Sequence, residues 1–220
     1  MSFCGPYRAQ CHSERFGDDV VQLWSVADLE RHVDRHALLA GDDPPEPPYW
    51  AHCWSGARVL AGEVPRGCGR AVEVGCGLGL PGLVAARRGW LVTFLDRRPE
   101  PFPFVRASAR ASGLPVPHCV VADVITPALV GGRFELVLAS ELVYERTAFA
   151  GLAEGLSRLL APDGLLLLAD AGRIDTAAFW TELAACGLRL DMSEQRVEEE
   201  GLPLSVRVVR GRWARRRAVS

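Results

Sequence analysis

The chain has 220 residues, of which 49% are hydrophobic and 24% charged, and these values predict one globular domain with a modest extension. Its 25 basic and 27 acidic residues leave a net charge of −2, which argues against a surface built to bind nucleic acid backbones. Every basic residue is an arginine, because the sequence has no lysine, and it has no asparagine either. Functions that need a lysine ammonium, such as a pyridoxal phosphate Schiff base or a P-loop, are therefore excluded.

The cysteines and the apolar runs predict the cellular compartment. Seven cysteines are spread along the chain without a CxxC pair, which is typical of free thiols in a reducing compartment. The first residues contain no apolar segment of a secretory signal, and the longest apolar run, Leu165–Ala169, is too short to cross a bilayer. The sequence therefore predicts a soluble cytoplasmic protein with no membrane partner.

Residues 1–62 are predicted to form a lead-in to a main domain over residues 63–220. Within it, Ser25 and Asp28 have the spacing of a capping box for a helix that begins near Leu29. The proline-rich stretch Asp42–Pro48 would interrupt any helix.

We expect no metal site in this lead-in. His32 and His36 are one helical turn apart but lack a third ligand. Cys4, Cys11 and His12 lack zinc-ligand spacing, and disorder is the default expectation for a chain terminus of this kind.

From about residue 70, short apolar segments alternate with helical ones. The predicted strands are Arg70–Gly75, Trp90–Asp96, Cys119–Asp123, Phe134–Ser140 and Leu165–Asp170. The predicted helices between and after them are Pro81–Arg88, Phe104–Ser112, Thr147–Leu160 and Thr176–Cys186. Strands that are apolar on both faces belong inside a parallel sheet, so the pattern predicts a doubly wound α/β fold. Leu188–Met192 and Ser205–Val209, separated by the charged turn Glu198–Gly201, predict an antiparallel hairpin at the sheet edge.

A glycine-rich segment follows the first of these strands. It reads Glu73-Val-Gly75-Cys-Gly77-Leu-Gly79, and such glycines let backbone N–H groups approach a ligand. The spacing Gly77-x-Gly79-x-x-Gly82, with Asp96 ending the next strand, also satisfies a dinucleotide-binding pattern. A nicotinamide-dependent oxidoreductase is therefore one alternative.

The position of Glu73 favours a cationic ligand over a pyrophosphate. A carboxylate two residues before the first glycine would repel phosphates but would attract the sulfonium and ammonium groups of S-adenosyl-L-methionine. Asp96 would then bind the ribose hydroxyls.

Three further segments resemble a known family, the class I seven-strand S-adenosylmethionine-dependent methyltransferases. They are Tyr49–Trp54 followed by Ser55-Gly56, Ser140–Tyr144, and Ala169–Arg173. The group they resemble comprises the protein-lysine methyltransferases related to the electron transfer flavoprotein β-subunit methyltransferase. The resemblance implies a mostly parallel seven-stranded sheet, S-adenosylmethionine as cofactor and methylation of a protein lysine. Glu141 stands where aspartate is commoner in this family, and Ser55-Gly56 replaces the usual Pro-Gly or Pro-Ser.

The resemblance also implies roles for individual residues. The predicted cofactor-binding residues are Trp54, Glu73, Gly75, Gly77, Gly79, Asp96, Asp123 and Ser140, with Asp123 at the adenine edge. Glu141 and Tyr144 are the predicted catalytic pair, because a carboxylate can hold an incoming ammonium and a tyrosine offers an aromatic face and a hydroxyl. The lead-in would help to build the acceptor side.

Several functions remain alternatives to lysine methylation. One is a small-molecule N-methyltransferase of the same fold, which would take an amine metabolite, and another is a catalytically silent binding module. The arginine-rich tail, Arg210–Arg217, could meet an acidic partner or a nucleic acid, but a solvated chain end is the commoner reading, and no nucleic acid partner is expected.

Overall fold

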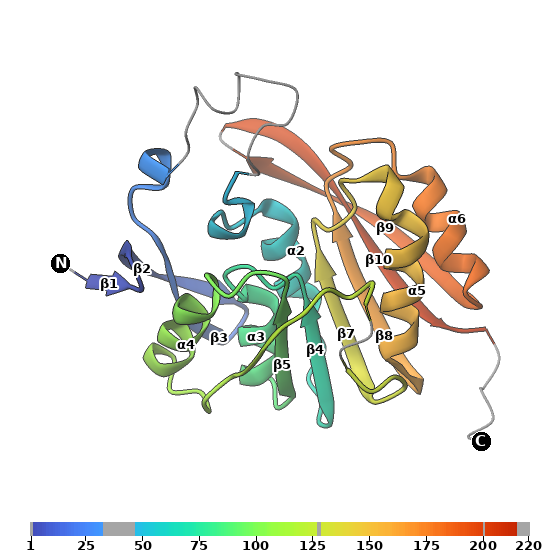
Figure 1. Cartoon of the computed structure of the whole chain (residues 1–220), viewed down its shortest axis with the longest axis horizontal. Coiled ribbons are helices and arrows are strands. Elements are labelled where there is room, and N and C mark those ends of the chain that lie inside the picture. The colour runs from blue at the N-terminus through green and yellow to red at the C-terminus, as the bar shows by residue number, and fades with distance from the viewer. Residues whose placement is uncertain (1, 33–46, 127–128, 200, 215–220) are drawn as a thin grey trace.

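The computed structural model describes residues 2–32, 47–126, 129–199 and 201–214 (Figure 1). Its main sheet has seven strands in the order β6-β5-β4-β7-β8-β10-β9. These strands are β4 (Arg70–Val74), β5 (Leu91–Asp96), β6 (His118–Val121), β7 (Phe134–Ser140), β8 (Leu160–Asp170), β9 (Leu188–Glu199) and β10 (Leu202–Trp213). All pairs from β6 to β8 are parallel and the last two are antiparallel, so the predicted fold class is confirmed.

Helices cover both faces of this sheet. They are α2 (Ser55–Glu63), α3 (Leu80–Arg87), α4 (Phe102–Ala111), α5 (Phe149–Leu159) and α6 (Ala177–Ala185), with 3₁₀ turns η1 (Leu29–His32), η2 (Tyr49–Ala51) and η3 (Arg146–Ala148). The four predicted helices correspond to α3–α6. None of the described helices is long and apolar enough to span a membrane.

Successive side chains along the central strands point to opposite faces of the sheet, and this divides the hydrophobic core into two layers. In β4, Ala71 belongs to the cluster that α2, α3 and α4 cover, whereas Val72 belongs to the cluster under α5 and α6. Figure 1 shows these two groups of helices on separate sides of the sheet. The strands are therefore buried on both faces, which is why they read as continuous apolar runs in the sequence.

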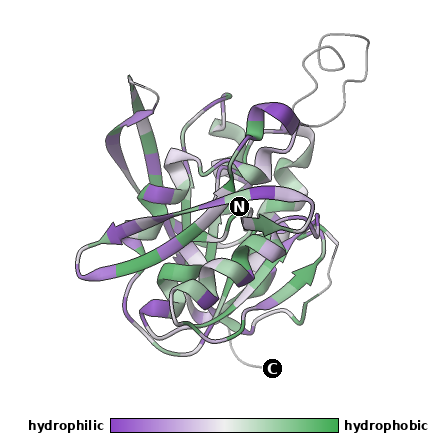
Figure 2. Ribbon diagram, turned by 90° about the vertical axis from the view of Figure 1, so that its left-hand side faces the viewer, coloured by the Kyte–Doolittle hydropathy of each residue, from purple (hydrophilic) through white to green (hydrophobic). Residues whose placement is uncertain are grey.

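The N-terminal region differs from its prediction. It forms a second, antiparallel sheet of β1 (Ser2–Cys4), β2 (Tyr7–Phe16) and β3 (Asp19–Val26), so the expectation of disorder around Cys4, Cys11 and His12 was wrong. Figure 2 shows hydrophilic and hydrophobic positions mixed along these strands.

The predicted capping box is also wrong. Ser25 lies inside β3, opposite Gln10 of β2, and Leu29 begins a 3₁₀ turn of four residues. His36 and residues 42–46 lie outside the described residues, so the predicted interruption there is not addressed by the structure.

The outer edge of β3 is covered by α4. The backbone N–H of Gln22 donates to the Ser112 hydroxyl at 2.8 Å, and that of Trp24 donates to the Ser108 hydroxyl at 2.9 Å. Two serines one helical turn apart thus replace a fourth strand, and they attach the second sheet to the main domain.

The C-terminal hairpin is confirmed, and it is longer than predicted because β9 and β10 pair along their full length. Arg210 and Arg212 lie within β10, and Arg210 forms an ion pair with Glu63 at the end of α2. The reading of the arginine-rich segment as a solvated chain end was therefore wrong for Arg210, whereas Arg212 is exposed although it lies within the strand. Arg215–Arg217 lie outside the described part of the chain.

Candidate active site

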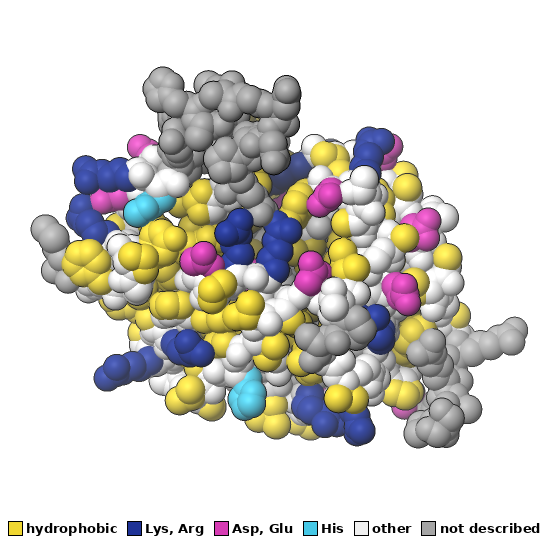
Figure 3. All heavy atoms as spheres, viewed as in Figure 1, with side chains coloured by type: hydrophobic (Ala, Val, Ile, Leu, Met, Phe, Trp, Pro, Cys, Tyr) yellow, Lys and Arg dark blue, Asp and Glu magenta, His cyan; other side chains and the backbone are white. Residues whose placement is uncertain are grey.

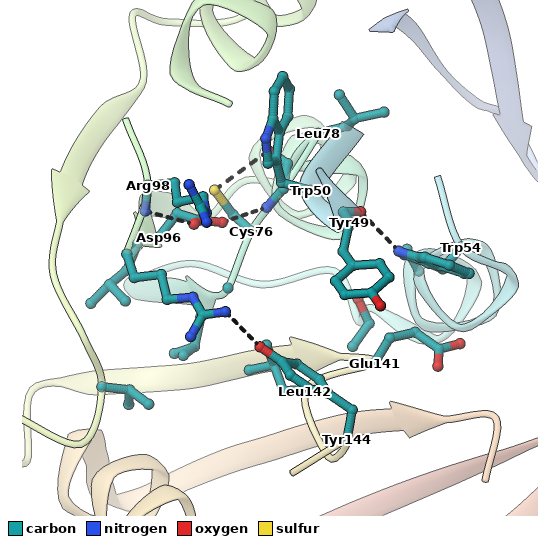
Figure 4. Close-up of a pocket in the computed structure, with 18 of the residues that line it drawn as sticks. Tyr49, Trp50, Trp54, Cys76, Leu78, Asp96, Arg98, Glu141, Leu142 and Tyr144 are labelled. Atoms are coloured by element: carbon teal, nitrogen blue, oxygen red, sulfur yellow. Dashed lines mark hydrogen bonds between the residues drawn. The ribbon is translucent and has the colours of Figure 1, made fainter. Parts of the chain in front are cut away.

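A cavity of about 430 Å³ lies between the turn that follows β4, Gly75–Gly79, and the end of β7. We call this turn the glycine turn. The chain passes from β4 outwards through β5 and β6, then returns to place β7 on the other side of β4. Ligands of open α/β sheets bind at such a point, outside the carboxyl ends of the strands. The cavity is lined by residues of the glycine turn, of the ends of β5 and β7, and of the segment before α2 (Figure 4).

The glycine turn forms one wall. Gly75, Gly77 and Gly79 have φ values of 58°, 48° and 77°, a left-handed backbone that favours glycine. A Cβ atom on Gly75 would lie 2.2 Å from the Leu142 side chain, and one on Gly77 would lie 3.0 Å from the Trp50 carbonyl oxygen. The glycines therefore allow the facing walls to approach the turn closely.

Asp96, the last residue of β5, holds this turn. One carboxylate oxygen accepts a hydrogen bond from the Gly77 N–H at 3.0 Å, and the other accepts one from the Arg98 N–H at 3.0 Å. Burial raises the pKa of Asp96, and these two hydrogen bonds oppose the rise. Each oxygen keeps further acceptor capacity toward the cavity, as recognition of ribose hydroxyls requires.

Glu73 is placed behind the turn and is not among the cavity-lining residues. It is 1% exposed, and its carboxyl group accepts a hydrogen bond from the Gly82 N–H at 2.9 Å. Burial raises its pKa to about 8. A Cβ atom on Gly82 would lie 2.5 Å from the Glu73 carboxyl oxygen. Close packing against Glu73 and Phe94 thus accounts for Gly82, the last glycine of the dinucleotide-like spacing.

Three aromatic side chains form the opposite end of the cavity. The ring centroid of Tyr49 lies 6.2 Å from that of Trp54 and 6.4 Å from that of Tyr144, and the Trp54 indole N–H donates to the Tyr49 carbonyl at 3.0 Å. Tyr49 and Tyr144 are 49% and 44% exposed. The Tyr144 hydroxyl accepts a hydrogen bond from Arg97 at 3.0 Å. We call the three aromatic side chains, Tyr49, Trp54 and Tyr144, the aromatic entrance, because they connect the cavity with the surface.

Glu141 has an unusual backbone. Its φ is 54°, and among the described residues no other residue except glycines has a positive φ. This conformation costs on the order of 1–2 kcal/mol and is concentrated at functional sites. Its carboxylate accepts a hydrogen bond from the Gly56 N–H at 3.0 Å and lies 3.4 Å from the Arg173 guanidinium. Burial raises its pKa, and Arg173 opposes the rise.

Nine of the ten predicted site residues line this one cavity, and Glu73 is the exception. The nine are Trp54, Gly75, Gly77, Gly79, Asp96, Asp123, Ser140, Glu141 and Tyr144. Asp123 is exposed in the loop after β6, where its carboxylate accepts a hydrogen bond from the Ile125 N–H at 2.9 Å. Sequence reasoning assigned no role to Arg97 or Tyr49. Tyr49 belonged to a segment that carried the family resemblance, whereas nothing in the sequence pointed to Arg97.

The lining residues fit S-adenosylmethionine. The volume lies within the range of small-molecule sites. Four acidic residues, Asp96, Asp123, Glu141 and Glu145, and two arginines, Arg97 and Arg98, line it, and this excess of acidic groups suits a ligand with a sulfonium and an ammonium. No cluster of three or more His, Cys, Asp or Glu side chains able to hold a metal occurs in the described ranges.

Comparisons with known proteins point to the same class. Residues 72–168 match the family model of the methyltransferase domain. The protein N-lysine methyltransferase METTL21A of Mus musculus is 35% identical over 130 residues, which are 53% of this chain and 58% of the relative. The ubiquinone biosynthesis O-methyltransferase of Xylella fastidiosa is 28% identical over 148 residues, or 66% and 60% of the two chains. The chain thus spans about three fifths of the length of these relatives.

Solved structures show the same fold. A TehB-like S-adenosylmethionine-dependent methyltransferase from Corynebacterium glutamicum superposes with a TM-score of 0.59 at 19% identity, covering 85% of this chain and 98% of its own. The [4+2]-cyclase SpnF superposes with a TM-score of 0.60 at 15% identity, covering 71% and 80%. At these identities the likeness concerns the fold alone. The chain thus shares its fold with S-adenosylmethionine-dependent methyltransferases, and residues 72–168 match the methyltransferase domain.

Proposed function

We propose that this protein methylates an amine nitrogen and that the acceptor is a protein lysine. The observation that carries the proposal is the aromatic entrance, which places Tyr49 and Tyr144 at the surface and leads to Glu141 inside the cavity. Aromatic faces and a carboxylate together attract a cationic amine. An entrance that reaches the surface also suits an acceptor carried on a flexible side chain of another protein.

In this reaction the protein mainly has to align the acceptor with the methyl group of the cofactor. When bound, the cofactor supplies an electrophilic methyl group, so the chain's residues mainly have to orient the acceptor and exclude water. A lysine amine with a pKa near 10.4 arrives protonated and must lose its proton before it can attack. We propose that Glu141 holds the ammonium and that the Tyr144 hydroxyl, held by Arg97, takes part in removing the proton.

The remaining predicted residues keep their proposed roles toward the cofactor. Asp96 would bind the ribose and Asp123 the adenine edge, while Trp54, Ser140 and the glycine turn would surround the rest. Glu73 would act indirectly, by holding Gly82 and so the geometry of the turn. The position of Tyr49 and Trp54 supports the proposal that residues 1–62 build the acceptor side, with residues 63–220 carrying the cofactor.

A small-molecule acceptor is the second candidate. It is favoured by the similarity to curated ubiquinone biosynthesis O-methyltransferases, one from Methylobacterium sp. being 30% identical over 125 residues. A cavity of about 430 Å³ is also large enough for a cofactor with part of a small acceptor.

The protein would act in the cytoplasm without nucleic acid. All seven cysteines are free thiols, which supports a reducing compartment. On the face shown in Figure 3, arginine and acidic side chains are interspersed with hydrophobic ones, and this mixture supports a protein or a small amine over a polyanion.

The test is transfer of a radiolabelled methyl group from S-adenosylmethionine into a cell lysate, followed by location of the label by mass spectrometry. The lysine proposal expects label on a lysine side chain of a protein. Label confined to small molecules would establish the second candidate, and label in neither fraction, with no cofactor binding by calorimetry, would reject methyl transfer.

Asp96 supplies the control for the cofactor site. Asp96→Ala should weaken cofactor binding by about 1.5–3 kcal/mol, because it removes hydrogen bonds to a charged acceptor, while Asp96→Asn should lose less. The matched control is Asp175→Ala, since Asp175 is an exposed aspartate whose carboxylate accepts a hydrogen bond from the Ala177 N–H at the start of α6. Unchanged cofactor affinity in Asp96→Ala would remove Asp96 from the site.

A further inference from the structure

An arginine outside the cavity contacts two of the residues that line it. Arg173, in the loop after β8, places its guanidinium carbon 4.5 Å from the centre of the Trp54 ring, and its Nε lies 3.4 Å from the Glu141 carboxylate. Trp54 and Glu141 line the cavity, whereas Arg173 does not. Arg173 therefore supports this part of the cavity wall from behind.

Glu199, the last residue of β9, anchors this arginine. Its two carboxylate oxygens accept hydrogen bonds from the Arg173 guanidinium at 3.1 and 2.9 Å. Burial acts to raise the pKa of Glu199, but the hydrogen bonds from Arg173 and Ser55 and the charge of Arg173 together hold this pKa below its ordinary value. Glu199 is thus ionised at neutral pH and stays paired with Arg173.

Both carboxylates also meet the first turn of α2. Glu199 accepts a hydrogen bond from the Ser55 N–H at 3.3 Å, and Glu141 accepts one from the Gly56 N–H at 3.0 Å. Trp54 immediately precedes these residues. The positive end of α2 and Arg173 therefore both stabilise the two carboxylates.

We propose that Arg173 is a positioning residue for the acceptor side, which holds the Trp54 ring and the Glu141 carboxylate in place and is itself fixed by Glu199 of the C-terminal hairpin. The role toward the acceptor rests on the proposed function, whereas the role toward Trp54 does not. An arginine is required because one planar group faces the ring and pairs with two carboxylates at once, which a lysine ammonium cannot do.

The chain offers a matched control at the other end of α2. Glu63, the last residue of that helix, accepts hydrogen bonds from Arg210 of β10 and from Gln195 of β9. It therefore ties the same hairpin to the same helix, but at the helix end opposite to Trp54. Glu63→Gln should weaken the attachment of the hairpin and leave the acceptor wall intact.

The first measurement needs no turnover. Acrylamide quenching of tryptophan fluorescence in the cofactor-free protein should increase in Arg173→Gln and Glu199→Gln, because Arg173 covers one face of Trp54 in the native protein. The increase should vanish when Trp54→Phe is added, and Glu63→Gln should show no increase. Equal quenching in Arg173→Gln and the native protein would overturn the proposal whatever the substrate is.

The second measurement uses the methyl transfer assay on the identified acceptor. Arg173→Gln and Glu199→Gln should lower kcat/KM for the acceptor by about tenfold, with the dissociation constant of S-adenosylhomocysteine changed by less than about twofold. Arg173→Lys should recover only part of this loss. An equal loss of kcat/KM in Glu63→Gln would reduce Arg173 to a general structural tie and overturn the proposal.

The pH profile gives a further distinction. The charged groups that act on Glu141 are Arg173, which lowers its pKa, and Asp170, which raises it. Without Arg173 the pKa of Glu141 rises further, so the acid limb of the pH–rate profile should move to higher pH in Arg173→Gln. An acid limb at the same pH in Arg173→Gln and in the native protein would show that Arg173 does not lower the pKa of a Glu141 carboxylate that takes part in the reaction. Absence of methyl transfer in the native protein, with the quenching result intact, would reject the proposed function and leave the placement of Trp54 standing.

Discussion

The buried carboxyl group of Glu73 lies behind the glycine turn and does not line the cavity that the sequence prediction assigned to it. Its position before the glycines suggested an anion that attracts a cationic ligand. In the structure, burial raises its pKa to about 8, so without a ligand it is largely protonated at neutral pH. Its visible task is to accept the Gly82 N–H at 2.9 Å and to fill the space that a side chain at Gly82 would need.

This burial predicts a pH dependence of stability. The folded-state pKa lies above the unfolded value near 4.3, so the folded protein binds the proton more tightly and loses stability as the pH rises from about 4 to about 8. Glu73→Gln keeps a hydrogen-bond acceptor for Gly82 without this charge. We expect it to gain about 2–4 kcal/mol relative to the native protein between pH 5 and pH 9. Urea unfolding of the cofactor-free proteins measures this, and parallel pH curves would show that Glu73 is not buried as described.

The catalytic pair can be separated from the cofactor site by substitution. Glu141→Gln keeps the size and the hydrogen bond from Gly56 but removes the charge that would hold an ammonium. We expect turnover to fall at least about tenfold, or about 1.4 kcal/mol in barrier, with cofactor affinity nearly unchanged. Tyr144→Phe should match this loss if the hydroxyl takes part and should be mild if only the ring does.

The same two variants define the outcome that rejects the assignment. Methylation of the identified acceptor at the native rate by the Glu141→Gln, Tyr144→Phe double variant would leave both residues with structural roles only. Loss of S-adenosylhomocysteine binding in Glu141→Gln would instead show that this carboxylate supports the cofactor.

Sequence motifs pointed to residues that line the cavity but not to the contacts of those residues. Glu141 could be chosen from its position after β7, because strand ends in a parallel sheet converge on one edge. Its positive φ and its pairing with Arg173 depend on chain segments that only the folded sheet brings together. Arg97 was missed for the same reason, because its partner Tyr144 is 47 residues away along the chain.

At the scale of elements, strands buried on both faces were predictable, while the N-terminal sheet was not. The strands from β4 to β8 contain short apolar runs, and only their ends differ from expectation. β2 instead carries mostly polar side chains, in the order YRAQCHSERF, and resembles a solvated segment. Its stability comes from pairing with β3, and β3 is held by serines of α4 nearly ninety residues away.

An ion pair at the start of β3 should stabilise this second sheet. Asp19, 7% exposed, accepts a hydrogen bond from the Arg88 guanidinium at 2.8 Å, and this bond outweighs burial and lowers the pKa of Asp19. Asp19→Asn should cost about 2–4 kcal/mol at pH 7, because the buried Arg88 guanidinium loses its anionic partner and keeps only neutral carbonyl acceptors, such as those of Val64 and Phe16. The matched control is Asp28→Asn, whose exposed pairing with Arg8 should contribute less than about 1 kcal/mol.

The pH dependence of this pair has the opposite sign to that of Glu73. A lowered folded-state pKa contributes stability that is complete above the unfolded value near 3.9 and is lost as the pH falls through the folded value. The difference in unfolding free energy between the native protein and Asp19→Asn should therefore shrink below about pH 4. A difference that stays constant down to pH 2 would contradict a role for the ionised carboxylate.

At the scale of the whole molecule, the two sheets share one hydrophobic core. Val21 and Leu23 of β3 belong to the same buried cluster as Leu60 of α2, Leu83 of α3 and Phe104 of α4. The predicted division into a lead-in and a main domain describes the order of the sequence, but the packing crosses that boundary. Segments that share a core are expected to unfold together.

Leu23→Ala tests this shared core. Leu23 is fully buried, so its truncation should cost about 2–5 kcal/mol through lost burial and a residual cavity. If the core is common to both sheets, circular dichroism and tryptophan fluorescence should report one coincident unfolding transition, shifted to lower urea concentration. The matched control is Leu202→Ala, which removes a leucine that is 70% exposed and should change stability by less than about 0.5 kcal/mol. A separate early transition in Leu23→Ala, with the remaining transition at its native midpoint, would show that the N-terminal sheet unfolds independently of the domain that carries the cavity.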